Sequence, residues 1–228
     1  MIDVHAHVLP FVDDGSPDVA SSLSMLRDMK ASGVTDLFLT PHYYPARGYY
    51  RTAADNQTVF NEFVQAAEGI GVTLRLGNEI YYTIDSLRDL RKGTVLPLGD
   101  SKCVLIEFSM AKEEEDIAEA IHNIRSIGYT PIIAHPERYP YLGKVADFEI
   151  IQKMGGLIQL NASSLTGKYG TTIQKFCFQV LKLGLVDFVA SDIHTFRHND
   201  LAEAYEAVVK RIGVETADRV FANPVVLR

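Results

Sequence analysis

The chain has 228 residues, 47% of them hydrophobic, which is enough for one domain, residues 1–228, with a full core. Its net charge is −7 and its pI about 5.5, and no block of Lys and Arg stands out, so we expect no nucleic-acid partner. The two cysteines lie far apart, and the N-terminus has neither a basic leader nor a long apolar segment. We therefore expect a cytoplasmic protein without membrane insertion, whose oligomeric state the sequence leaves open.

Short apolar runs of β type alternate with amphipathic helical stretches along the whole chain. The runs start roughly 30 residues apart, which is the size of one β/α unit. Near-continuous apolar runs indicate parallel strands that are buried on both faces. The seven runs begin at Ile2, Asp36, Thr73, Cys103, Thr130, Leu157 and Asp187.

The stretches between several of these runs have helical periodicity and end at glycine, the residue favoured just after a helix. They span residues 16–33, 52–71, 113–128, 171–184 and 200–213. Strands and helices that alternate in this way predict an α/β fold.

Each apolar run ends in a side chain that can bind a metal or form hydrogen bonds. In chain order these residues are His5 with His7, His42, Glu79, Glu107, His135, Asn161, and Asp192 with His194. In a β/α barrel the carboxyl ends of the strands converge on one face, where active sites lie. An open sheet would spread the same groups along a line. The pattern therefore favours a distorted (β/α)7, TIM-like barrel with a metal cluster at one end.

The first run is the most informative of the seven. His5 and His7 are two residues apart on a strand, so their side chains point the same way and can bind one ion. Asp13 and Asp14 follow in a loop, and we expect one of them to become a ligand. Imidazole and carboxylate ligands without thiolate suit Mn²⁺, Fe²⁺ or Zn²⁺, and suit Mg²⁺ less well.

The sequence lacks the motifs of other phosphatase classes and of nucleotide-binding proteins. A cysteine phosphatase needs Arg six residues after its Cys, and here Ser109 follows Cys103 and Leu183 follows Cys177 at that spacing. The sequence has no GxSxG, GxxxxGK[ST] or GxGxxG motif. The interpretation that we keep for this sequence is a metal-dependent phosphoesterase.

Six segments resemble the polymerase-and-histidinol-phosphatase (PHP) family, and within it the bacterial capsule-biosynthesis tyrosine phosphatases of the CpsB/CapC type. The segments are MIDVHAHVLPFVDDG at 1–15, LTPHYYP at 39–45, GNEIYY at 77–82, LIEFS at 105–109, AHPERY at 134–139 and SDIH at 191–194. The resemblance spans nearly the whole chain and implies the PHP fold, a distorted barrel of seven β/α units.

The resemblance also implies a set of metal ligands for two or three ions, with Mn²⁺ expected first and Fe²⁺, Zn²⁺ or Mg²⁺ as alternatives. The first ion would be bound by His5, His7, Glu79 and Asp192. The second would be bound by Glu79, Glu107 and His135, and the third by Asp14, His42 and His194.

Three arginines are candidates for binding substrate. By resemblance, Arg138 of the HPER segment binds the phosphate, and Arg197 is the nearest match to a second family arginine, although TFRHNDL departs from the family wording. Arg47, in the loop at 43–51, is the third candidate. Asp192 or His194 could orient the attacking water, and the sequence does not decide between them.

The resemblance implies phosphotyrosine protein as substrate, typically a tyrosine kinase that controls polysaccharide export. The alternatives are a small-molecule phosphatase of the same fold that acts on histidinol phosphate or a nucleotide, an amidohydrolase, and a non-catalytic metal-binding module. Glu107 stands where an amidohydrolase usually carries a modified Lys, and Arg138 has no obvious use in amide hydrolysis. Four tyrosines flank the loop at 43–51 and could stack on a substrate ring or simply pack at the surface: Tyr43, Tyr44, Tyr49 and Tyr50.

Overall fold

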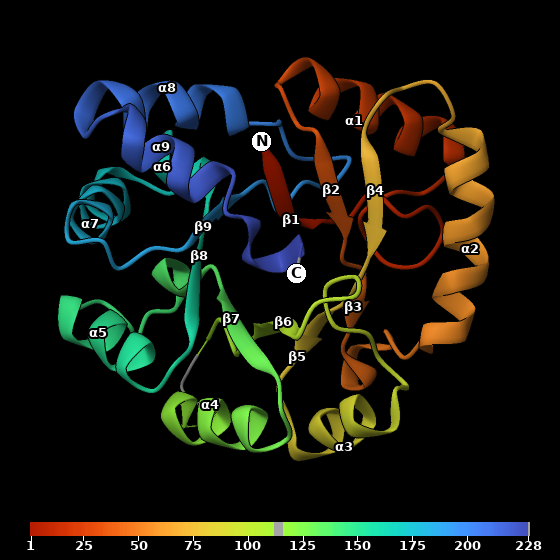
Figure 1. Cartoon of the computed structure of the whole chain (residues 1–228), viewed down its shortest axis with the longest axis horizontal. Coiled ribbons are helices and arrows are strands. Elements are labelled where there is room, and N and C mark those ends of the chain that lie inside the picture. Colours follow the sequence, from red (N-terminus) through yellow and green to blue (C-terminus); the bar gives the residue numbers. More distant parts are fainter. Residues whose placement is uncertain (112–115, 228) are drawn as a thin grey trace.

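The computed structural model describes residues 1–111 and 116–227, and it shows parallel strands surrounded by helices (Figure 1). The strands are β1 Ile2–Ala6, β2 Asp36–Leu39, β3 His42–Tyr43, β4 Thr73–Leu76, β5 Glu79–Tyr81, β6 Cys103–Glu107, β7 Thr130–Ala134, β8 Leu157–Asn161 and β9 Phe188–Ala190. All seven predicted runs therefore contain strands, and the α/β class is confirmed.

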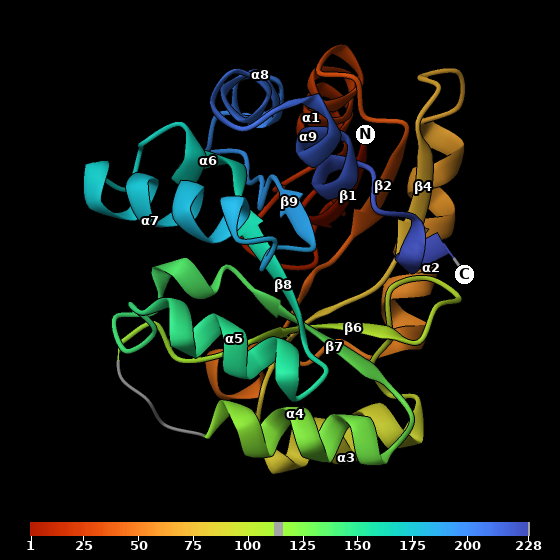
Figure 2. The same cartoon turned by 60° about the vertical axis from the view of Figure 1, so that its left-hand side comes forward.

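Helices connect successive strands on the outside. They are α1 Val19–Ala31, α2 Ala53–Ala66, α3 Ile84–Lys92, α4 Ile117–Ser126, α5 Val145–Lys153, α6 Ala162–Leu165, α7 Thr171–Lys182, α8 Leu201–Arg211 and α9 Val214–Phe221, with short 3-10 turns η1 Pro45–Arg47, η2 Pro136–Arg138 and η3 Pro224–Leu227. Helices α4 and α5 pack outside β7 and β8 (Figure 2). Within the described ranges, no helix is long and apolar enough to cross a membrane.

Two helices begin later than the sequence predicts. Helix α1 starts at Val19 and not at residue 16, because the Asp18 side chain accepts a hydrogen bond from Ser21 N at 2.7 Å and caps the helix there. Helix α4 starts after Asp116, which caps it through Ala118 N and Glu119 N. Residues 113–115 of that predicted helix lie outside the described residues.

Two of the predicted strands are interrupted in the middle. Between β2 and β3 lies Pro41, which has no N–H to donate to a ladder. Between β4 and β5 lie Gly77 and Asn78, and a Cβ at Gly77 would come within 2.8 Å of Leu98 Cδ2. Asn78 Nδ2 donates to the carbonyl oxygen of Pro41 at 3.0 Å, so the two breaks face each other. His42 and Glu79 open β3 and β5 directly after these breaks and are paired in register.

The strands form two parallel sheets, in the orders β1-β2-β4 and β3-β5-β6-β7-β8-β9. Ala6 of β1 forms an isolated bridge with Ile193 in the segment directly after β9, and hydrogen bonds run from Asp192 N to His5 O at 2.9 Å and from His7 N to Ile193 O at 3.0 Å. A closed barrel, which we expected, is not seen among the described strands.

A buried carboxylate joins the two sheets where β1 meets β9. Asp3 is fully buried, and its oxygens accept hydrogen bonds from Ser191 Oγ at 2.6 Å and Ser191 N at 3.1 Å. Burial raises the pKa of Asp3 to about 6, although these hydrogen bonds oppose the shift. Apolar side chains from both sheets also share one cluster, which includes Val4 and Phe38 from the first sheet and Leu105 from the second. The strand ends are thereby held close enough to build one site.

Candidate metal centre

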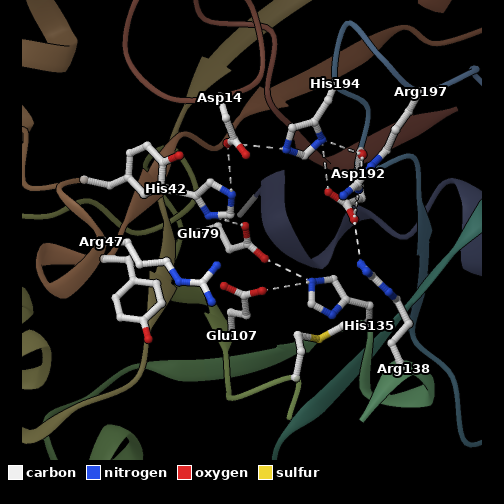
Figure 3. Close-up of a pocket in the computed structure, with 13 residues that line it drawn as sticks. Asp14, His42, Arg47, Glu79, Glu107, His135, Arg138, Asp192, His194 and Arg197 are labelled. Carbon is white, nitrogen blue, oxygen red and sulfur yellow. Dashed lines mark hydrogen bonds and ion pairs between the residues drawn. The ribbon is translucent and has the colours of Figure 1, made fainter.

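The ligand-type side chains predicted from the strand ends lie together around one cavity of about 200 Å³ (Figure 3). The cavity is lined by Asp14, His42, Glu79, Glu107, His135, Asp192 and His194, with the arginines Arg47, Arg138 and Arg197 and the side chains of Tyr44, Tyr49 and Met110. His5 and His7 lie fully buried beside these residues. The structure therefore brings together every ligand candidate and all three arginines.

Glu79 lies at the centre of this group. Its Oε1 is 3.2 Å from His5 Nε2 and 3.1 Å from His135 Nε2, and its Oε2 is 3.2 Å from His7 Nε2 and 2.9 Å from His42 Nδ1. Burial alone would raise the pKa of Glu79, but the positive charges of His5 and His42 and the hydrogen bonds to it hold that pKa well below its usual range. One carboxylate thus contacts four imidazoles from three different strands or strand ends.

Four overlapping groups of ligand atoms each lie within 4.8 Å of one another. The groups are His7, Asp14, His42 and His194; His5, His135 and Asp192; His5, His7 and Glu79; and His42, Glu79 and Glu107. Together they contain all the predicted ligands. The grouping differs from the expected ion-by-ion division in that His7 joins Asp14, His42 and His194.

Several observations of the site fit divalent ions. Glu79 Oε2 is buried and lacks a hydrogen bond of good geometry within the described residues, although two imidazole nitrogens approach it. His5 Nε2 and His7 Nε2 are only 3.1 Å apart, so their lone pairs are directed into the same small space. A positive ion between such groups would satisfy them together.

The buried histidines differ in protonation. Burial lowers the pKa of His135 to about 4, although Glu79 lies beside it. Burial and the neighbouring charge of His7 lower the pKa of His194 to about 3. Both rings are therefore neutral near pH 7 and have a lone pair to offer. Burial, together with the charge of Glu79, raises the pKa of Glu107 to about 8.

A layer of hydrogen bonds behind the ligands fixes their orientation. Asp13 Oδ2 is 2.7 Å from His7 Nδ1, and Gln159 Oε1 is 3.0 Å from His5 Nδ1, so both rings direct Nε2 into the site. A Cβ at Gly15 would come within 2.2 Å of His7 O, so only glycine lets the 13–15 loop lie this close. Asp14 thus joins the ligand cluster while Asp13 lies behind His7.

Two amides on β8 extend this layer across the site. Gln159 Nε2 donates to Asn161 Oδ1 at 2.9 Å, and Asn161 Nδ2 donates to Asp192 Oδ2 at 2.8 Å. The sequence pointed to Asn161 as a hydrogen-bonding residue but missed Gln159. Its position two residues before Asn161 could have indicated it, because residues two apart on a strand face the same side.

Two ligand candidates have left-handed backbones, which non-glycine residues rarely adopt. These are His135, with φ of 35°, and Asp192, with φ of 50°. Such conformations cluster at functional sites. Directly after His135, the η2 turn is fastened by buried Glu137, whose Oε1 accepts from Asn161 N at 2.9 Å and Ser164 Oγ at 2.6 Å. This turn places Arg138 at the rim of the cavity.

Arg138 and Arg197 share one carboxylate. Arg138 Nη1 is 3.2 Å from Asp192 Oδ2, and Arg197 Nη1 contacts the same oxygen and also donates to the Asp192 carbonyl at 2.9 Å. Arg47 lies across the cavity, its guanidinium 5.4 Å from the centroid of the Tyr44 ring. Cations thus border the ligand cluster on both sides (Figure 3).

Other side chains considered from the sequence lie elsewhere or form walls. Tyr44 stacks on Tyr81 at 3.8 Å between ring centroids, and Tyr49 stacks on His42 at 5.3 Å. Cys103 and Cys177 are buried in β6 and α7, and burial raises the pKa of both thiols. Neither thiol has the low pKa that a cysteine nucleophile needs.

The fold and the site define an α/β protein with a candidate multinuclear metal centre bordered by arginines. The family model for "Capsular polysaccharide synthesis, CpsB/CapC" matches residues 1–227, and the chain belongs to this family.

Its relatives in this family include tyrosine-protein phosphatases. CpsB of Streptococcus agalactiae is 34% identical, with 97% of this chain and 95% of the relative covered. YwqE of Bacillus subtilis is 31% identical, with 94% and 86% covered. A solved structure described as YwqE from Bacillus subtilis and CpsB from Streptococcus pneumoniae, unique metal-dependent tyrosine phosphatases, matches with a TM-score of 0.85 at 30% identity, covering 95% of this chain and 90% of that one.

Metal binding should release protons near neutral pH. In the metal-free protein, Glu107 holds its proton up to about pH 8, and the pKa values of His5, His7 and His42 are raised as well. Ligation requires the deprotonated forms, so the affinity for Mn²⁺ should rise as the pH increases through neutrality towards the pKa of Glu107, about 8. Calorimetric titration in two buffers of different ionisation enthalpy measures the released protons.

The matched control is Glu119→Gln, at an exposed position on α4, which should leave the proton count unchanged, whereas Glu107→Gln should lower it. Equal heats in both buffers, with an affinity that does not depend on pH, would contradict this account.

Proposed function

We propose that this chain is a metal-dependent protein-tyrosine phosphatase that acts in capsular or exopolysaccharide synthesis. The observation that carries the proposal is the position of Arg138 beside the ligand cluster, where it contacts Asp192 at 3.2 Å. A metal-binding module without phosphate chemistry has no need of a guanidinium at this place. Membership of the CpsB/CapC family, and the tyrosine-phosphatase names of the relatives, support the same activity.

The proposed ligands of the ions are those that the family resemblance implies. They are His5, His7, Glu79 and Asp192 for the first ion; Glu79, Glu107 and His135 for the second; and Asp14, His42 and His194 for a third. All nine belong to the groups of neighbouring ligand atoms described above, although there His7 also lies with Asp14, His42 and His194. Mn²⁺ is the proposed metal, ahead of Fe²⁺, Zn²⁺ and Mg²⁺, because imidazole and carboxylate are mixed in the set. When bound, such ions would lower the pKa of a water molecule and offset the charge of phosphate.

The residues at the rim bind and orient the substrate in this proposal. Arg138 would exchange its contact with Asp192 for two parallel hydrogen bonds to phosphate oxygens, which its planar guanidinium can form. Arg197 would help in the same way, and Arg47 would contact the substrate from the opposite wall. Asp192 or His194 would orient the attacking water; both side chains line the cavity. Tyrosine leaves as a phenolate, which needs little help from a general acid.

The proposed substrate is phosphotyrosine protein, in particular a bacterial tyrosine kinase, and the proposed compartment is the cytoplasm. The acidic net charge of −7 supports a protein partner over a nucleic acid.

We also propose that residues 1–228 form one domain and that its strands act as a distorted barrel of the PHP type. The hydrogen bonds between Asp192 and His5 and between His7 and Ile193 support this closure, since they join the last strand to the first.

Phosphate release from a phosphotyrosine peptide tests the proposed activity. The protein loaded with Mn²⁺ should hydrolyse the peptide faster than histidinol phosphate, and EDTA should abolish the reaction because the metal supplies the chemistry. Cys103→Ser and Cys177→Ser should keep the activity, since both thiols are buried away from the cavity. Activity that survives EDTA, or that a folded serine variant loses, would overturn the proposal.

Arg138→Ala should lower turnover while metal content stays unchanged. Removing one charged contact to the transition state costs about 2–4 kcal/mol, which is a loss of roughly 30- to 1,000-fold. Steady-state kinetics and elemental analysis measure the two quantities, with Arg27→Ala, an exposed position on α1, as control. A parallel loss of metal would make Arg138 a residue that supports the fold of the site.

A further inference from the structure

A second cavity, of about 370 Å³, adjoins the metal cavity, and Arg197 lines both. This accessory cavity is bordered by Ser163, Lys168, Tyr169, Ser191, Phe196, Arg197, His198 and Asp200. Its volume lies in the range of about 300–1,000 Å³ that is usual for ligand pockets. None of the proposed metal ligands lines it in the described residues.

Two aromatic rings form walls of the accessory cavity. Phe196 is 68% exposed, and its ring lies 5.0 Å from the His194 ring, at the boundary with the metal centre. An aromatic ring with this exposure contributes little to the core and remains available to a ligand. Tyr169 forms another wall, and the Arg138 guanidinium lies 4.9 Å from the centroid of its ring. The accessory cavity is thus continuous with the residues that border the metal centre.

The charged groups of the accessory cavity are already balanced. Lys168 Nζ lies 2.7 Å and His198 Nδ1 lies 3.3 Å from Asp200 Oδ1, and Arg197 is paired with Asp192. Asp200 is 2% exposed, and its Oδ2 has no hydrogen-bond partner within the described residues. A second phosphate would therefore find no unpaired cation here. An uncharged side chain suits the cavity better.

We propose that the accessory cavity binds the side chain of a residue next to the phosphotyrosine in a polypeptide substrate, and that it prefers a hydrophobic, aromatic side chain. The inference rests on the proposed phosphatase activity and deepens it. A phosphotyrosine in the metal cavity places its flanking residues at the rim, and Arg197 is the part of the rim that the two cavities share. A small-molecule substrate would leave the accessory cavity empty.

The test compares p-nitrophenyl phosphate, which has no flanking residues, with two phosphotyrosine peptides whose flanking residues are Phe or Ala. Kinetics are measured on the protein loaded with Mn²⁺. For the unmodified protein we expect a KM roughly 3- to 10-fold lower for the Phe peptide, the effect of one added aromatic contact.

Two variants change the cavity in opposite ways. Phe196→Ala removes a wall, and Ser163→Leu fills the space. Each should bring the KM of the Phe peptide up to that of the Ala peptide, with little change in kcat or in the hydrolysis of p-nitrophenyl phosphate. Phe11→Ala is the matched control, because Phe11 is 62% exposed but lines neither cavity, and it should preserve the preference for Phe.

The outcomes separate the two proposals. If the unmodified protein hydrolyses all three substrates but has the same KM for both peptides, the accessory cavity is rejected and the phosphatase activity stands. The inference is also overturned if Phe196→Ala and Ser163→Leu both leave the preference intact, or if they impair p-nitrophenyl phosphate equally. A protein that hydrolyses none of the substrates would overturn the proposed activity itself.

Discussion

The contact of one buried carboxylate, that of Glu79, with four imidazoles is the interaction on which the rest of the site depends. Glu79 is 1% exposed, and the rings of His5, His7, His42 and His135 approach it within 2.9–3.2 Å. Burying so many ionisable groups is costly unless they neutralise one another, and protons alone do this incompletely where several rings compete for one carboxylate. The strand breaks before His42 and Glu79 serve this arrangement, because they let two neighbouring strands direct these side chains toward one point.

Around Glu79, residues of the same type occupy different positions and make different contacts. Asp13 fixes His7 from behind while the neighbouring Asp14 joins the ligand cluster, and Gln159 holds His5 in the matching way. Asp192 contacts the cluster on one side and two arginines on the other. A phosphate that enters the cavity would compete with this carboxylate for the guanidinium groups, so the same contact that keeps the arginines in place also makes their release to substrate possible.

The sequence predicted the strands, and it predicted that the ligand-type side chains at their ends lie together. Both predictions rest on local signals: an apolar run of the right length, and the residue type at its end. It could not predict the breaks at Pro41 and Gly77, the two-sheet arrangement, or the role of Gln159, since each depends on which strands become neighbours. Helices α3, α5 and α9 were also missed, because each spans only eight or nine residues. The choice between Asp13 and Asp14 needed three-dimensional positions, because adjacent loop residues carry the same local signal. The accessory cavity has no sequence signature, because its walls come from the segments after α6 and after β9.

The central claim is that Glu79 holds the metal cluster together, and the metal content of Glu79→Gln tests it most directly. Glutamine keeps the size of the side chain but removes the charge that the imidazoles and ions share. Elemental analysis of the purified variant, after saturation with Mn²⁺ and removal of free metal, should show at least one ion fewer per chain than the unmodified protein, with a folded circular dichroism spectrum. A folded variant that keeps the full complement of ions would contradict the account.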